Sequence, residues 1–271
     1  MLKFSLSNLN NDMTTNIPKF KRKAIDIHSH FNHGVAGDDL NPNFEMLSIP
    51  TLDFMMAENE RFGIGEVGYS TYASVLTSDN IVSENEYLRK LSDENENIYQ
   101  WVVIHPEQEL TLTQAEKMLK YDKVLGIKIH SPMHKYDIRT YGNKIFSFAH
   151  EMKATVLMHP HDIYAMPQFA DKYPDMNLII AHLGSRSHID AIKSAKHGNI
   201  YTDTSGYLSS LNNIIEYTVE SVGSEKILFG TDTYSPAHQY SRIAFARISQ
   251  ADTENILYKN AIRLFPNAFK P

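Results

Sequence analysis

Residues 24–30 read Ala-Ile-Asp-Ile-His-Ser-His, an apolar run that ends in two histidines separated by one residue. This pattern predicts a β-strand. Because successive side chains of a strand point to opposite faces, His28 and His30 are expected to share a face and to bind one metal ion together. Asp26 shares that face and is expected to support a ligand, since a carboxylate bonded to a ligating imidazole fixes its tautomer.

Three later apolar runs also end in residues that bind metals. His159, His182 and Asp232 each stand where an apolar run gives way to turn residues. In a parallel barrel the carboxyl ends of the strands lie at one mouth, where active sites are found. Together with His28 and His30, these residues are therefore predicted to form one metal site.

Predicted strands alternate with predicted helices along the chain. The strands are predicted at Ala24–His30, Phe62–Tyr69, Ile98–His105, Val124–His130, Thr155–His159, Leu178–His182, Ile200–Asp203 and Ile227–Asp232. The helices are predicted at Thr113–Lys120, Lys144–Lys153, Pro167–Tyr173, Ile189–Lys196, Leu211–Val222, Tyr240–Ser249 and Glu254–Leu264. Such alternation predicts a parallel sheet with right-handed crossovers. The fold class is predicted as α/β, a single-domain (β/α)8 TIM barrel over residues 24–271, preceded by an N-terminal arm of residues 1–23.

Composition excludes several classes of protein. The 271 residues are 42% hydrophobic, and no apolar stretch approaches the roughly 18 residues of a membrane span. The net charge of −6, without a long basic run, does not favour nucleic-acid binding. The N-terminal residues lack the apolar core of a secretory signal, which predicts a cytoplasmic protein. The expected partner is a small-molecule substrate. The sequence is compatible with a homodimer but does not decide the oligomeric state.

The absence of cysteine limits the ligands of the predicted metal site. With no cysteine in the chain, a metal must be held by imidazole, carboxylate or a modified lysine. A site rich in imidazole with one carboxylate favours zinc, and manganese is the alternative where oxygen ligands increase.

Four separated motifs occur in the order typical of a known family. They are residues 25–30 (IDIHSH), residues 172–175 (KYPD) with 180–184 (IAHLG), residues 229–232 (FGTD) and residues 260–265 (NAIRLF). In these motifs the chain resembles the amidohydrolase superfamily, and in detail its amidohydrolase-2 branch of barrel-fold metal-dependent hydrolases and decarboxylases. The resemblance implies that His28 and His30 bind one metal, that His159 and His182 lie on strands five and six, and that Asp232 ends strand eight.

Lys128, on the predicted fourth strand, leaves two kinds of metal site open. Binuclear relatives carry a carboxylated lysine or a glutamate at this place. A carboxylated Lys128 would bridge two ions, with His159 and His182 on the second ion and Asp232 beside the hydroxide. A mononuclear site would use the two histidines of the first strand with His159 and Asp232. His182 would then orient or polarise the substrate, and Lys128 would be a free ammonium group.

Four further residues are candidates for contact with the substrate. Arg186 and Arg139 follow predicted strands, and each can grip a carboxylate through a bidentate fork. His130 and His105 end predicted strands and are expected to line the pocket.

The predicted activity is metal-dependent hydrolysis of a C–N, ester or lactone bond in a small molecule. A bound metal would lower the pKa of its water to about 7, and Asp232 would take the proton and pass it to the leaving group. The alternative is non-oxidative decarboxylation of an aromatic or unsaturated acid, a lyase reaction within the same family. A carboxylated Lys128 with two metals favours hydrolysis, whereas a free Lys128 with one metal favours decarboxylation. The predicted catalytic residues are Asp232, His182 and Lys128.

Overall fold

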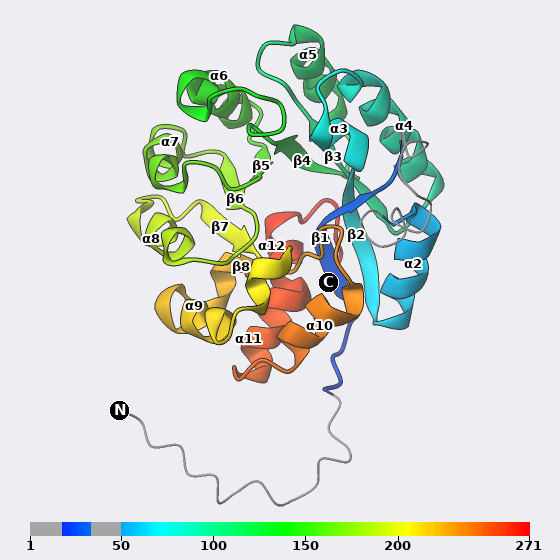
Figure 1. The fold of residues 1–271 in the computed structure, drawn as a ribbon, viewed down its shortest axis with the longest axis vertical. Helices are drawn as coiled ribbons and strands as arrows, with labels where there is room; N and C mark the ends of the chain where they lie inside the picture. Colours follow the sequence, from blue (N-terminus) through cyan, green and yellow to red (C-terminus); the bar gives the residue numbers. More distant parts are fainter. Residues whose placement is uncertain (1–17, 34–49) are drawn as a thin grey trace, which may run out of the picture.

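The strands of the protein form one parallel barrel. The structure, a computed structural model, describes residues 18–33 and 50–271. Eight strands follow one another in sequence order, and each pairs in parallel with the next (Figure 1). They are β1 (Ala24–Phe31), β2 (Ile64–Thr71), β3 (Ile98–Val103), β4 (Val124–Ile129), β5 (Thr155–Met158), β6 (Asn177–Ile180), β7 (Ile200–Asp203) and β8 (Ile227–Leu228). The predicted single-domain (β/α)8 barrel is confirmed.

Backbone hydrogen bonds close the barrel between its last and first strands. Although β8 is only two residues long, the Ile27 N–H donates to Phe229 O at 2.9 Å. The Asp232 N–H donates to His28 O at 2.7 Å. Asp232 is therefore held in place by the closure of the barrel itself.

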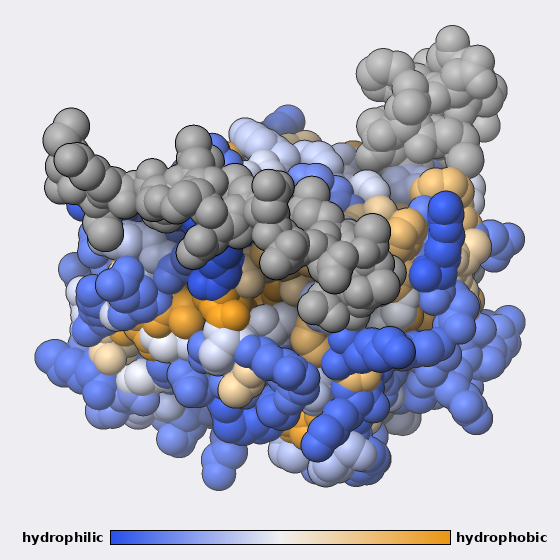
Figure 2. Space-filling view, turned by 90° about the horizontal axis from the view of Figure 1, so that it is seen from below, coloured by the Kyte–Doolittle hydropathy of each residue, from blue (hydrophilic) through white to orange (hydrophobic). Residues whose placement is uncertain are grey.

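Helices surround the strands on the outside of the barrel (Figure 1). They are α2 (Leu52–Arg61), α3 (Tyr72–Leu76), α4 (Ile81–Glu94), α5 (Glu109–Met118), α6 (Ile138–Glu151), α7 (Met166–Lys172), α8 (Arg186–Ser194), α9 (Ile214–Val222), α10 (Pro236–Ala244), α11 (Gln250–Glu254) and α12 (Asn260–Leu264). Short 3-10 turns lie at η3 (Ile163–Ala165), η4 (Tyr207–Ser210) and η5 (Ser224–Lys226), and the π-helical segment η6 (Asn255–Lys259) joins α11 to α12. Hydrophilic side chains predominate on the face drawn in Figure 2. No helix in the described part of the chain is long and apolar enough to cross a membrane.

The helices α2 to α4 were not predicted, and α4 shows why. Its buried face includes Glu84 and Asn85 beside apolar residues, so the apolar period of a helix is interrupted. The Asn85 amide bonds the backbone N–H and C=O of Val103 in β3, each at 2.9 Å. A polar contact thus lies beside the apolar packing of Ile81 and Leu88 between this helix and the sheet.

The N-terminal arm meets the barrel just before β1. Its described residues attach to β2 through Arg22, which forms an ion pair with Glu66 at 2.6 Å. Residues 1–17 of the predicted arm lie outside the described residues.

Trp101, the single tryptophan of the chain, links β3 to β1 inside the core. Its indole N–H donates to Ile27 O at 2.6 Å. A Cβ at Gly68 of β2 would lie 3.0 Å from the Trp101 nitrogen, and a Cβ at Gly126 of β4 would lie 2.9 Å from its ring. Glycine on each neighbouring strand therefore makes room for the indole.

Trp101→Phe is expected to lower the free energy of unfolding by about 1–3 kcal/mol, because a buried hydrogen bond is lost and a void is left. Urea unfolding followed by far-UV circular dichroism measures this, since the variant has no tryptophan fluorescence. As a control, the exposed Tyr164→Phe should change stability by no more than about 0.5 kcal/mol. Equal unfolding midpoints for Trp101→Phe and the wild type would contradict the proposed role of the indole.

Candidate active site

The predicted ligands meet at the carboxyl ends of the strands. His28 and His30 lie within β1, and Lys128 lies in β4. His159 follows the last residue of β5, while His182 and Asp232 lie beyond the ends of β6 and β8. This is the end of the barrel at which TIM-barrel active sites are built.

Three of these residues form a compact group of metal-donor atoms. His28 Nε2 lies 3.2 Å from His30 Nε2, and His30 Nε2 lies 3.7 Å from Asp232 Oδ1. One donor atom from each residue lies within 4.8 Å of the others. A tetrahedral site with bonds of about 2.1 Å places its donors about 3.4 Å apart. The spacing therefore fits a single divalent cation.

Hydrogen bonds fix the orientation of both histidines of β1. His28 Nδ1 lies 2.8 Å from Asp203 Oδ2, and His30 Nδ1 lies 3.0 Å from Ser70 O. These oxygens only accept, so each Nδ1 carries the hydrogen and each Nε2 presents a lone pair. Burial, reinforced by Lys128, lowers the pKa of His28 to about 4 and holds the pKa of His30 well below its usual range. Both rings are neutral, as metal ligation requires.

Lys128 lies directly against this group. Its side chain is buried, and Nζ lies 2.7 Å from His28 Nε2. Burial lowers the pKa of Lys128 to about 8, although Asp232 and Asp203 act in the opposite direction. An imidazole Nε2 has one lone pair, so a metal on His28 and the bond from Lys128 are alternatives. Metal binding would therefore release the Lys128 amine.

His159 occupies a neighbouring place in the cluster. Its Nδ1 lies 3.2 Å from His182 Nε2, and its ring stacks on His130 with centroids 4.0 Å apart. His182 Nε2 in turn lies 3.9 Å from Asp232 Oδ2. Burial and the adjacent His130 lower the pKa of His159 to about 2. His159 thus joins the cluster through His182, and it belongs to neither three-residue donor group found among residues 18–33 and 50–271.

The family model for amidohydrolases matches residues 25–266. The chain belongs to the amidohydrolase family. Comparison with curated proteins found no sequence match.

Solved structures that resemble this amidohydrolase include decarboxylases and one candidate hydrolase. A 5-carboxyvanillate decarboxylase from Novosphingobium aromaticivorans, complexed with manganese, has a TM-score of 0.73 at 12% identity. The match covers 91% of this chain and 96% of the decarboxylase chain. A 2,6-dihydroxybenzoate decarboxylase from Rhizobium has a TM-score of 0.70 at 15% identity. The match covers 90% of this chain and 99% of the decarboxylase chain. A candidate 2-pyrone-4,6-dicarboxylic acid hydrolase from Pseudomonas putida has a TM-score of 0.65 at 16% identity. The match covers 93% of this chain and 100% of the hydrolase chain. At these identities the likeness shows a shared fold.

Two residues of the amidohydrolase site have left-handed backbones. The φ angles of His182 and Asp232 are 63° and 61°, a region that residues other than glycine rarely adopt. Hydrogen bonds hold both, because the His182 N–H donates to Asp203 Oδ1 at 3.0 Å and the Asp232 N–H donates to His28 O. Strained backbone that the surroundings hold in this way is typical of functional sites.

Asp203, at the end of β7, was missed in the sequence although it closes a strand like the predicted ligands. It is fully buried and contacts His28, His182 and Ser205. Burial raises its pKa, but His28 and the hydrogen bonds outweigh burial and hold the pKa well below its usual range. His28, His182 and Asp203 form the second donor group. Since Asp203 already accepts hydrogen bonds through both oxygens, we interpret this group as a support for the first.

Of the four residues predicted to contact the substrate, one lies in the histidine cluster and three do not. His130 enters the cluster by stacking on His159. Arg139 instead forms an exposed ion pair with Asp162, with 2.8 Å between Nη2 and Oδ1. The Arg186 guanidinium lies over the Tyr217 ring, 5.6 Å from its centroid, and His105 Nε2 lies 3.3 Å from His134 O. These three residues have their contacts outside the metal-donor group.

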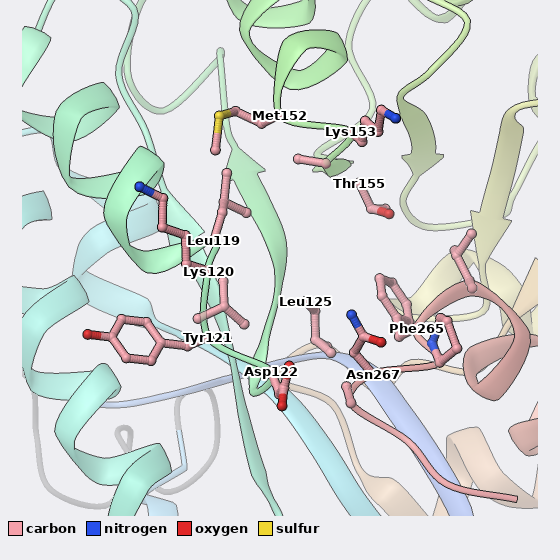
Figure 3. Close-up of a pocket in the computed structure, with 15 residues that line it drawn as sticks. Leu119, Lys120, Tyr121, Asp122, Leu125, Met152, Lys153, Thr155, Phe265 and Asn267 are labelled. Atoms are coloured by element: carbon pink, nitrogen blue, oxygen red, sulfur yellow. The ribbon is translucent and has the colours of Figure 1, made fainter.

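A separate cavity of about 290 Å³ opens at the other end of the barrel (Figure 3). Its lining comes from the turns before β4 and β5, from the first residues of these strands, and from the end of α12 and the chain after it. It includes Tyr121, Lys153, Thr155 and Asn267. Because the amino ends of the strands form this face, the cavity does not belong to the site at the barrel mouth.

Proposed function

We propose that this amidohydrolase is a metal-dependent, non-oxidative decarboxylase of a small aromatic or unsaturated carboxylic acid. The observation that carries the proposal is the buried Lys128 amine in contact with the His28, His30 and Asp232 group. A metal and an ammonium group side by side provide two positive charges for one carboxylate. The decarboxylases of similar fold support the same choice. Decarboxylation therefore ranks above hydrolysis here, the reverse of the order predicted from the sequence.

Each residue of the cluster has a distinct part in this reaction. His28, His30 and Asp232 would hold a divalent cation, which would supply an electrophile for the oxygens of the substrate. Lys128, once released from His28 Nε2, holds the carboxylate by its charge. Asp232 presents Oδ1 to His30 and Oδ2 to His182, so Asp232 and His182 together can deliver a proton.

The proposed reaction consumes one proton and releases CO₂. The proton from the Asp232 and His182 pair adds to the carbon that bears the carboxylate, using a π electron pair of the substrate. The bond to the carboxylate then breaks, and its electrons restore the π system. The pair takes up this proton from solvent at the Nε2 lone pair of His182 before each turnover, so atoms and charge balance over one turnover.

In the test, protein loaded with manganese or zinc is incubated with each of three compounds. Two are acids, 5-carboxyvanillate and 2,6-dihydroxybenzoate, and one is a lactone, 2-pyrone-4,6-dicarboxylate. We expect release of CO₂ from an acid. In deuterated water the product should carry one deuterium at the carbon that lost the carboxylate. Ring opening of the lactone without CO₂ release from either acid would contradict the proposal.

Hydrolysis is the second candidate, and the lowered pKa of Lys128 favours it. At a pKa of about 8, part of the Lys128 amine is neutral near pH 7, and a neutral amine can react with CO₂ to form a carbamate. The carbamate would supply oxygen ligands to two metals. Two metals per chain, with labelled CO₂ incorporated at Lys128, would favour hydrolysis, whereas one metal and an unmodified Lys128 favour decarboxylation.

A further inference from the structure

We propose that Asp203 is a positioning residue that sets the hydrogen positions of both His28 and His182. One of its oxygens holds the metal-ligand histidine, and the other holds the backbone and the serine that orient the proton-transfer histidine. The proposal rests on the proposed metal site, but it does not depend on which reaction follows.

The first branch runs from Asp203 to His28. Asp203 Oδ2 lies 2.8 Å from His28 Nδ1, and an ionised carboxylate only accepts hydrogen bonds. His28 must therefore carry its hydrogen on Nδ1. Lys128, as an ammonium 2.7 Å from Nε2, requires the same arrangement, because it can only donate. Two independent partners thus assign one tautomer.

The second branch runs through Ser205 to His182. The Ser205 hydroxyl donates its one hydrogen to Asp203 Oδ1. Its oxygen, 2.9 Å from His182 Nδ1, is then left to accept from that ring. His182 therefore carries its hydrogen on Nδ1 and presents the Nε2 lone pair toward His159 and Asp232.

Two glycines leave room for this arrangement. A Cβ at Gly206 would lie 2.9 Å from His182 Nδ1, and the φ of Gly206 is +77°. A Cβ at Gly230 would lie 3.0 Å from the Cβ atoms of both His28 and Ser205. The backbone is thus shaped so that Ser205 can approach both imidazoles.

The test begins with histidine tautomers in the metal-free wild-type protein, measured by nitrogen-15 NMR. We expect the Nδ1–H tautomer for both His28 and His182. Ser205→Ala should release the His182 tautomer and lower turnover. The variant also loses a 2.9 Å contact to His28 Nδ1, but the bond from His28 to Asp203 remains, so metal affinity should fall less than in Asp203→Asn. Asp203→Asn should weaken metal binding about 10–100-fold, since a side-chain amide has one oxygen that accepts and one NH2 group that only donates.

Ser92→Ala is the matched control, because Ser92 is also fully buried but lies in α4. It should change neither the tautomers nor metal binding. An Nε2–H tautomer of His28 or His182 in the wild type would overturn the inference. Unchanged metal affinity in a folded Asp203→Asn variant would also overturn it. If that variant does not fold, the wild-type tautomers and Ser205→Ala decide.

The outcomes separate this inference from the proposed function. A wild-type protein that shows the expected tautomers but binds no metal would defeat the proposed function and leave the tautomer assignment standing. A protein that binds metal and releases CO₂ with other tautomers would defeat only the inference.

Discussion

Asp232→Asn should keep most of the metal affinity of this amidohydrolase and lower its turnover about 10²–10⁴-fold, the usual contribution of a positioned proton-transfer group. The amide retains an oxygen that can face His30, but it cannot carry a proton between substrate and His182. Turnover is measured as kcat with saturating acid, and metal affinity by calorimetric titration of the metal-free protein.

Asp171→Asn serves as the control for this substitution. Asp171 lies in α7, where its carboxylate accepts from the Lys196 N–H, so turnover should not change. Unchanged turnover in Asp232→Asn would eliminate Asp232 as the proton-transfer group. Complete loss of bound metal would instead show that the ligand role of Asp232 dominates.

His28→Ala should abolish stoichiometric metal binding and, with it, turnover. The change removes the Nε2 that lies 3.2 Å from His30 Nε2, and it leaves Lys128 without its acceptor. The loss of affinity should exceed the about 10–100-fold typical of residues that only support a ligand. Metal content after dialysis, measured by atomic absorption, tests this directly.

The control variant for His28→Ala is His33→Ala. His33 lies close to His28 in the chain, but it bonds Glu84 at 2.9 Å and stacks on Tyr87. This variant should retain the metal content of the wild type. A His28→Ala protein with as much metal as His33→Ala would refute the assignment of His28 as a ligand.

Local pattern was sufficient to predict the strands that carry the site. The apolar run before His28 and the turn residues after His159 and His182 are readable without any tertiary contact. The predictions for β5, β6 and β8 extend past the observed ends, which are Met158, Ile180 and Leu228, whereas β1 continues to Phe31, one residue beyond its predicted end. Beyond these ends regular strand pairing stops, although single backbone hydrogen bonds to the neighbouring strands continue, and at His182 and Asp232 the backbone becomes left-handed.

The helices and the supporting residues were harder to predict, for two different reasons. In α4 the polar Asn85 lies on the buried face, so the apolar period is weak. Asp203 closes its strand as His159 does, and that pattern could have indicated it as a site residue. Its partner His28 lies on β1, however, and nothing local in the chain links β7 to β1.

The sequence by itself determined the barrel, the shared face of His28 and His30, and the end of the barrel at which the site lies. These properties depend on the period of a strand and on the alternation of strands with helices, which are local. Only the tertiary structure decided that His159 faces His182 rather than the β1 histidines, that Lys128 bonds His28, and that Asp203 joins His28 to His182. The contacts of Lys128 and Asp203 with His28 connect strands that are not hydrogen-bonded neighbours, so they arise only when the barrel closes. The contacts of His182 with His159 and Asp203 join adjacent strands, but their distances depend on how the side chains meet at the mouth.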